Sequence, residues 1–223
     1  MIELPAIQEE LLKAVAAVGK PMIVLNSSGR PVDLHRIEGY ADAIMQIWHP
    51  GVCAGKAVAG LLSGRYNPSG KLPITFYRSV EDLPDFLDYT MKNRTYRYFN
   101  GSPLWHFGYG MSYTSFEFGK PKYKQGKLTV DVKNSGKFDG DEVVQVYIRR
   151  IDDVNGPIKT LKAFKRITLK AGEKQNICID MPRESFEVWD AETNTMRVVS
   201  GKYEVMVGNS SRAEDLKTIT VKI

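Results

Sequence analysis

The sequence predicts an α/β plus all-β chain, in which a partial parallel-sheet α/β sandwich is followed by an antiparallel β-sandwich. Two observations lead to this prediction. Over residues 1–76, helical apolar patterns alternate with short continuous apolar runs, which is typical of βαβ units. From residue 120 onward the apolar period becomes two, and turn residues separate the alternating segments. We therefore place two domains at residues 1–112 and 113–223.

The first predicted element is an amphipathic helix that begins near Pro5, a residue suited to a first helical position. Gly19 and Pro21 end this helix. Its apolar residues recur at three- and four-residue spacing and form one face, made of Ile7, Leu11, Ala14, Val15 and Val18.

Three buried strands are predicted next, at residues 22–25, 43–48 and 72–76, with a helix over 53–62. Three strands make a small sheet. A crossover helix normally follows a strand of the same sheet, and here we expect that strand to lie upstream of the helix, outside this chain. We therefore expect the C-terminal portion of a longer protein. A small but complete α/β domain is the alternative.

Two glycine-containing segments are predicted to set geometry. Asn67-Pro68-Ser69-Gly70 predicts a tight turn in which Gly70 accepts a positive φ. Residues 77–112 form a long aromatic and acidic connection, which is typical of a binding loop or a bridge between domains. Within it, Phe107-Gly108-Tyr109-Gly110 is predicted to pack rings against permissive backbone and so to join the two domains.

The second half predicts strands with one apolar face each, and Cys178 falls out of phase with its neighbours, so it should face away from the core. Tyr147 is the one aromatic residue that we identify on the polar faces of these strands. The predicted core-facing residues are Leu128, Val130, Val132, Val144, Val146, Ile148, Ile177, Ile179, Met181, Tyr203, Val205, Val207, Ile219, Val221 and Ile223.

Composition excludes several classes of function. The chain has 223 residues, of which 43% are hydrophobic and 26% charged, and no apolar run is long enough to predict a membrane span. Acids interleave with the basic residues behind the net charge of +5, and Lys120, Lys122 and Lys124 indicate a solvated strand face, so we expect no nucleic-acid partner. Two cysteines without a CxxC motif predict no zinc site, and we expect no metal and no cofactor.

Three sets of motifs follow one another along the chain. The first is Trp48-His49-Pro50-Gly51, then Gly55, Ala57, Val58, Leu61 and Gly64, then Asn67-Pro68-Ser69-Gly70-Lys71-Leu72-Pro73, and the second is Phe107-Gly108-Tyr109-Gly110-Met111-Ser112-Tyr113-Thr114-Ser115-Phe116. The third is Glu142-Val143-Val144-Gln145-Val146-Tyr147, Leu161-Lys162-Ala163-Phe164-Lys165 and Ser200-Gly201-Lys202-Tyr203-Glu204-Val205. Together these motifs resemble glycoside hydrolase family 3, and the third set resembles that family's fibronectin type III-like module. The similarity covers the whole chain in order.

The resemblance implies a retaining β-glycosidase for glucosides or xylosides, whose chemistry needs a nucleophilic carboxylate and a protonated acid/base. In the family the nucleophilic Asp lies on an upstream (β/α)₈ barrel and the acid/base Glu in a loop before the segment that matches Leu4-Pro5. Both would precede Met1, so we expect no catalytic residue in this chain. The acids considered as substitutes, and set aside as helix-entry, helix-surface or solvated loop residues, are Glu3, Glu9, Glu10, Asp82, Asp85 and Asp88.

Four residues are candidates for substrate binding. Trp48 and His49 end a predicted parallel strand at its carboxyl edge, where open α/β sheets bind ligands. Tyr96 and Arg97 offer a stacking face and a hydrogen-bond donor to a sugar. The alternative is that Trp48 is a core residue, that His49 makes a turn hydrogen bond, and that the aromatic loop packs between domains.

Three hypotheses of function stay open. The first is the C-terminal region of a glycosidase, whose substrate is an oligo- or disaccharide β-glycoside and whose partner domain is the upstream barrel. The second is a non-catalytic module that binds carbohydrate or protein, and the third a pseudoenzyme or partial gene product that assembles with a separate barrel chain. Residues 1–5 do not resemble a signal peptide, and the family resemblance implies a periplasmic or secreted parent protein in bacteria.

Overall fold

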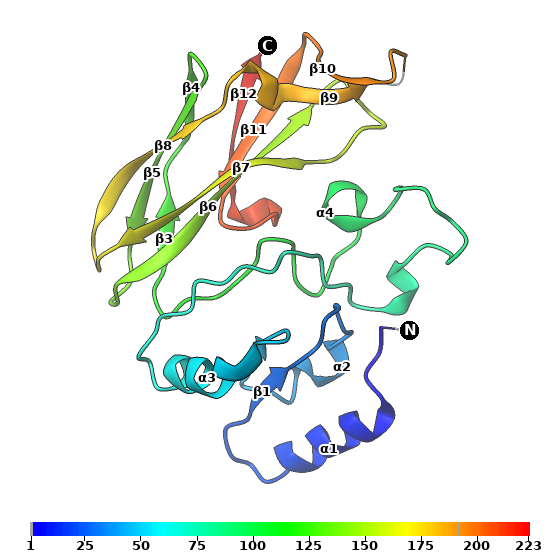
Figure 1. Ribbon diagram of the computed structural model, residues 1–223, viewed down its shortest axis with the longest axis vertical. Coiled ribbons are helices and arrows are strands. Elements are labelled where there is room, and N and C mark those ends of the chain that lie inside the picture. The colour runs from blue at the N-terminus through cyan, green and yellow to red at the C-terminus, as the bar shows by residue number, and fades with distance from the viewer. Residues whose placement is uncertain (1, 191) are drawn as a thin grey trace.

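An α/β part lies at one end of the molecule and a β-sandwich at the other, with a long segment of mostly irregular chain between them (Figure 1). This computed structural model describes residues 2–190 and 192–223. The α/β part contains α1 (Ala6–Ala16), β1 (Ile23–Asn26), α2 (His35–Glu38), β2 (Ala43–Gln46), the 3₁₀ turn η1 (Gly51–Cys53) and α3 (Ala54–Leu62). The mixed α/β plus all-β class predicted from the sequence is confirmed.

The two strands β1 and β2 pair in parallel, from Ile23 opposite Ala43 to Asn26 opposite Gln46. This confirms the predicted parallel pairing, but the prediction that both strands are buried is wrong, because Ile23, Leu25 and Ala43 are exposed. The helix α3 follows within two residues of the predicted bounds. The core beneath this small sheet is built from Val32, Leu34, Ile37, Phe76 and Leu104.

The third predicted strand, residues 72–76, is wrong as a member of the parallel sheet. This segment instead runs beside residues 104–109: the Phe76 amide donates to the Trp105 carbonyl (2.9 Å), and the pair forms an isolated antiparallel bridge. Extended backbone must satisfy its N–H and C=O groups, and here the returning aromatic segment satisfies them. Phe76 is nevertheless fully buried. The apolar run therefore indicated correctly that the segment belongs to the core, but it did not indicate which segment it pairs with.

The tight turn predicted at residues 67–70 is also not formed. Gly70 does not take a positive φ, and residues 67–70 form no turn. The side chains of this segment instead contact the β-sandwich, and these contacts explain the composition of the segment.

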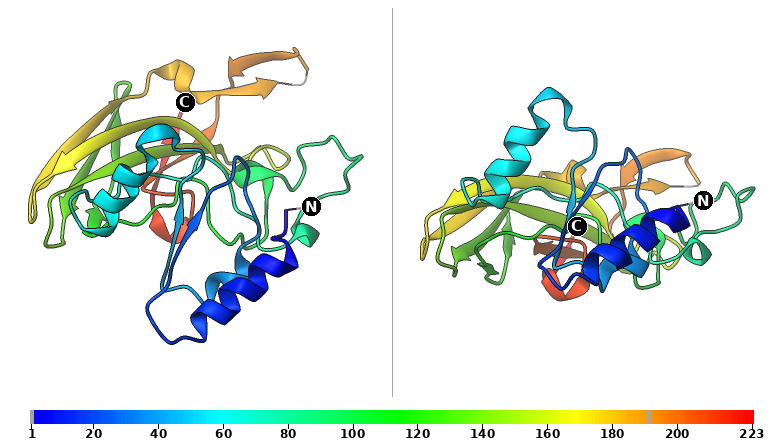
Figure 2. Two further views of the ribbon diagram at one scale, coloured as in Figure 1. Left: turned by 60° about the horizontal axis from the view of Figure 1, so that its bottom comes forward. Right: turned by 90° about the horizontal axis from the view of Figure 1, so that it is seen from below.

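The apolar face of α1 is exposed. Ile7 and Leu11 are 71% and 62% exposed, while Glu9 on the same helix is buried beside Arg36. Figure 2 shows α1 along the edge of the molecule, with no other element on its outer side. Ile23 and Leu25 of β1 are exposed as well. The α/β part therefore leaves an uncovered apolar surface on one side.

Two antiparallel sheets form the β-sandwich. One has the order β12-β11-β6-β7, and in the other β5 pairs with β3, β4 and β8. The strands are β3 (Phe116–Phe118), β4 (Lys122–Lys124), β5 (Lys127–Asn134), β6 (Gly140–Arg150), β7 (Thr160–Leu169), β8 (Lys174–Asp180), β11 (Lys202–Gly208) and β12 (Leu216–Lys222). A separate hairpin of β9 (Glu187–Asp190) and β10 (Thr195–Val198), which the sequence did not predict, follows the turn η3 (Arg183–Phe186).

The period-two pattern predicted the core of the sandwich well. Of the fifteen residues named, twelve are buried. The other three, Ile219 and Val221 on β12 and Ile223 just after it, pack against the same core in partly buried positions. Cys178 is exposed between buried Ile177 and Ile179, as its phase predicts.

Little regular structure interrupts the connecting segment 77–112. It contains the 3₁₀ turn η2 (Val80–Asp82) and one turn of helix, α4 (Thr95–Tyr98). A last 3₁₀ turn, η4 (Ala213–Asp215), precedes β12. Within the described residues, no helix has the length and apolar character needed to cross a bilayer.

The exposure of α1 can be tested by comparing two substitutions. We expect Leu11→Ser to change the free energy of unfolding by less than about 0.5 kcal/mol, because the side chain is already in water. Ile37→Ala, at a fully buried position, should cost about 2–5 kcal/mol. Urea denaturation of the two variants measures both values, and equal losses would contradict the exposed position of the α1 face.

Candidate functional site

Trp48 and His49 lie where the sequence placed them, just beyond the carboxyl end of β2. The Ser27 hydroxyl donates to the Trp48 carbonyl (2.8 Å), and the side-chain Nδ2 of Asn26 donates to Gln46 Oε1 (2.5 Å), so hydrogen bonds join the ends of both strands. His49 is exposed to solvent. The parallel pair thus presents a polar edge of the kind at which α/β sheets bind ligands.

The backbone of Trp48 is in an uncommon conformation. Its φ is 52°, a left-handed value that bulky residues rarely adopt. The ring is half-buried at the α/β core, with its centroid 6.3 Å from that of Phe76. Such a conformation persists only where the surroundings hold it, and here the Ser27 hydrogen bond and the ring packing do so.

Tyr96 and Arg97 lie in α4, and they hold the connecting segment against the β-sandwich. The Tyr96 ring stacks on Phe107 at 4.2 Å, and its hydroxyl accepts a hydrogen bond from the Leu161 amide (3.1 Å). The Arg97 carbonyl accepts the Ile158 amide (2.7 Å). Among the residues that the structure describes, no hydrogen bond or ring contact joins this pair to Trp48 or His49.

Tyr147 does not lie on an open polar face, so that expectation is wrong. It is fully buried, with Tyr96 and Phe107 against its ring at 5.8 and 6.5 Å. Its hydroxyl donates to Gln145 Oε1 (2.5 Å), and burial raises the pKa of this phenol above its ordinary value. The aromatic connection covers this face of β6, which period-two counting cannot reveal.

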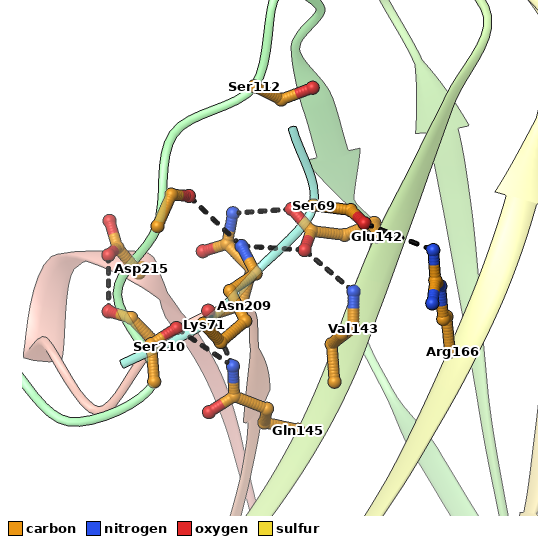
Figure 3. Close-up of polar contacts among 12 residues, drawn as sticks. Ser69, Lys71, Ser112, Glu142, Val143, Gln145, Arg166, Asn209, Ser210 and Asp215 are labelled. Carbon is orange, nitrogen blue, oxygen red and sulfur yellow. Dashed lines mark hydrogen bonds and ion pairs between the residues drawn. The ribbon is translucent and has the colours of Figure 1, made fainter. Parts of the chain in front are cut away.

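The motifs of the first half meet the β-sandwich at a polar junction, which we define as Asn67, Lys71, Gly110, Glu142, Gln145 and Asn209. At its centre Lys71 Nζ lies 2.7 Å from Glu142 Oε1, and the two side chains are only 12% and 3% exposed. Figure 3 shows Lys71 and Asn209 both reaching Glu142. Asn209 donates to Glu142 Oε2 (3.0 Å) and the Val143 amide to Oε1 (2.7 Å), so both carboxylate oxygens are satisfied.

Two amide side chains complete the junction. Asn67 Oδ1 accepts the Ser112 hydroxyl and the Tyr113 amide (both 2.8 Å), and its Nδ2 donates to the Asp139 carbonyl (3.0 Å). Gln145 Nε2 donates to the carbonyls of Gly108 (3.1 Å) and Asn209 (2.7 Å). Asn67 and Gln145 therefore connect backbone that is far apart in sequence.

Two glycines allow the backbone to approach this closely. A Cβ on Gly110 would lie 2.0 Å from the Gly70 carbonyl oxygen, and Gly108 has a φ of +79° with Gln145 directly against it. The prediction that Phe107–Gly110 packs rings on permissive backbone between the two parts is confirmed by these contacts.

Sequence reasoning missed the junction, although one signal was present. Glu142 shares its strand phase with Val144, Val146 and Ile148, all of which are buried. A charged residue in phase with core residues predicts a buried and paired charge. The partner, Lys71, comes from a distant segment and could not be identified by phase.

The three aspartates set aside as catalytic substitutes have local roles. Asp82, Asp85 and Asp88 accept backbone amides of the connecting segment, from Ser79, Leu87 and Thr90. The Thr90 hydrogen bonds hold the pKa of Asp88 below its ordinary value. Glu9, expected on the helix surface, is instead buried. Among the described residues no group of three or more His, Cys, Asp or Glu side chains is arranged to hold a metal ion.

The close approach at Gly110 can be tested with a matched pair of glycines. We expect Gly110→Ala to cost at least about 1 kcal/mol, because the new Cβ meets the backbone of Gly70. Gly70→Ala should be tolerated, since nothing lies within 4 Å of a Cβ there. Thermal unfolding of both variants provides the measurement, and equal stability would contradict the described packing.

The buried ion pair is tested by removing one charge or both. We expect Lys71→Met to cost about 3–5 kcal/mol, because it leaves the Glu142 charge buried without its partner. The double variant with Glu142→Leu should recover much of that loss. Lys127→Met, at the exposed pair with Asp180, is the control and should have little effect. Urea denaturation giving the same small loss for both lysines would refute a buried pair.

Comparison with known proteins is consistent with this arrangement. Residues 1–113 match the Glycosyl hydrolase family 3 C-terminal domain, and residues 142–211 match the Fibronectin type III-like domain. A xylan 1,4-beta-xylosidase of Xylanibacter ruminicola is 46% identical over 100% of this chain and 26% of its own length. A periplasmic beta-glucosidase of Salmonella typhimurium is 36% identical over 94% of this chain and 30% of its own length.

Among solved structures, a beta-glucosidase of Bifidobacterium adolescentis superposes with a TM-score of 0.90 at 32% identity, covering 100% of this chain and 36% of that chain. The chain therefore spans about a quarter to a third of the length of the curated relatives reported above. The matches cover both the α/β part and the β-sandwich in a single order. From these family matches and the fold they share, we conclude that the chain belongs to glycoside hydrolase family 3 and corresponds to its C-terminal region.

Proposed function

We propose that this chain is the C-terminal region of a retaining β-glycosidase that hydrolyses β-glucosides or β-xylosides, and that it contributes no catalytic carboxylate itself. The observation that carries the proposal is the match of the whole chain to part of a β-xylosidase and of a β-glucosidase. Retaining hydrolysis needs two carboxyl groups on opposite sides of the scissile bond, one of them with a raised pKa.

The local roles of the acids support the absence of a catalytic pair. The three aspartates of the connecting segment stabilise its turns, and the pKa of Asp88 is lowered, the opposite of what an acid/base residue requires. Glu142 is buried but is neutralised by Lys71. Each of these four carboxylates therefore has a structural role.

The uncovered apolar surface supports an upstream partner. In the whole protein we propose that the (β/α)₈ barrel and the first strands of the α/β sandwich precede this chain and cover the faces of α1 and β1. Residues 1–112 would then be the end of that sandwich, and residues 113–223 the fibronectin type III-like domain. Large contiguous apolar surfaces are rare on proteins that act alone.

For substrate binding we retain Trp48 and His49. They stand at the carboxyl edge of the parallel pair, and His49 is free to face solvent. Tyr96 and Arg97 remain part of the proposal only as residues that position the connecting segment, because the Tyr96 hydroxyl and the Arg97 carbonyl bind the β-sandwich backbone.

A non-catalytic binding module is the second candidate. Exposed Phe138, Phe164 and Trp189 on the β-sandwich favour it, since aromatic rings stack on sugars. These rings belong to three separate segments, and the aromatic residue expected to support this role, Tyr147, is buried. Calorimetry against soluble β-glucans separates the two: heat that is lost on Trp189→Ala would favour the module.

The catalytic part of the proposal is tested with nitrophenyl β-glucoside and β-xyloside. We expect the 223-residue chain to release no nitrophenol above the blank. The same chain produced with its upstream coding region should hydrolyse one or both substrates. Turnover by the 223-residue chain that is abolished by substituting one of its own carboxylates would overturn the proposal.

A further inference from the structure

A cavity of about 210 Å³ lies between the connecting segment and the β-sandwich, near α4 and η4, which face each other across the middle of the molecule (Figure 1). Its lining includes Tyr96 and Phe99 from the connecting segment and Lys159 and Ser211 from the β-sandwich. Besides Tyr96, the polar and titratable residues that line it are Thr75, Asn100, His106, Lys159 and Ser211. Neither the junction nor the proposed catalytic function uses this cavity.

Lys159 brings a positive charge to the cavity without a counter-ion. Its ammonium group donates to the Ser211 carbonyl (2.6 Å), and Glu214 acts on it only through space, with no carboxylate at ion-pair distance in the part of the chain described. Partial burial lowers the pKa of Lys159, which is the mark of a desolvated charge. An ammonium group has three donors, so donors remain for a ligand.

Two buried hydroxyl groups of the same lining residues have no hydrogen-bond partner. They are Thr75 Oγ1, in the segment that runs beside residues 104–109, and Ser211 Oγ, in the loop that follows β11. A buried polar group that stays unsatisfied is costly, so each such group calls for a missing partner. Both residues line the cavity together with Lys159, so one acceptor bound there would serve donors from all three residues.

The nearby acids are already engaged. Glu214 pairs with Arg212 (3.0 Å), and Asp215 accepts the Ser210 hydroxyl (2.6 Å). His106 has its pKa lowered, chiefly by burial and then by Lys159, and so adds a neutral ring to the lining. The cavity therefore combines donors with one unneutralised cation, the combination that oxyanions require.

We propose that this cavity binds a small oxyanion, the class that includes phosphate, sulfate and carboxylates, with Lys159 as its charge partner and the Thr75 and Ser211 hydroxyls as further donors. The site would lie between the two parts of the chain. A bound anion would therefore stabilise their association, because ligands stabilise the state that binds them.

Titration calorimetry and thermal unfolding with inorganic phosphate, sulfate and acetate test the proposal on the 223-residue chain, with chloride at equal ionic strength as the reference. We expect at least one oxyanion to bind and to raise Tm above the chloride value. Lys159→Gln should weaken that binding about tenfold or more. Lys133→Gln, which removes an exposed lysine on β5, is the matched control and should leave it unchanged.

Thr75→Val supplies a second variant should Lys159→Gln fail to fold. Because the Thr75 hydroxyl has no partner, its removal should leave Tm in anion-free buffer unchanged or higher, yet weaken oxyanion binding several-fold. Absence of binding by the unmodified chain, or equal binding by the Thr75→Val and Lys133→Gln variants, would overturn the proposal.

Discussion

The ion pair between Lys71 and Glu142 places two full charges in a buried part of the contact between the α/β part and the β-sandwich. Burying such charges is costly unless each finds enough hydrogen bonds, and here Asn209, the Val143 amide and the Gly110 carbonyl provide them. That requirement fixes the position of residues 67–73 on β6. It also fixes the return of residues 104–110, whose backbone lies against both.

How well each part of the fold could be predicted depends on whether its signal lies in the local sequence or in contacts between distant residues. Period-two patterning is local, and it identified the core from Leu128 to Val207 because each strand shows its buried face in its own sequence. The 72–76 segment gave an apolar run of the same kind, but its pairing with 104–109 is a tertiary property. Gly70 carried a turn signal that the contacts of Asn67 overrode.

The candidate site was predicted only in part, because some of its features also depend on contacts between distant residues. Trp48 and His49 follow a strand, so their place at its edge could be deduced, whereas the left-handed backbone of Trp48 could not. Tyr96 looked like a sugar-stacking residue, and its partner Phe107 is close enough in sequence to have suggested packing instead. The exposed face of α1 shows most clearly what a local pattern cannot predict. An amphipathic pattern indicates that a helix has an apolar face, but not which element covers that face.

The central claim is that the buried ion pair makes the two parts of the chain one cooperative unit. Native-state hydrogen exchange of the Val143 and Phe76 amides tests it most directly. Val143 lies at the ion pair, and Phe76 lies in the segment that follows Lys71. The account predicts that both amides exchange with the same free energy of opening and the same dependence on denaturant. Free exchange at Phe76 while Val143 stays protected would contradict it.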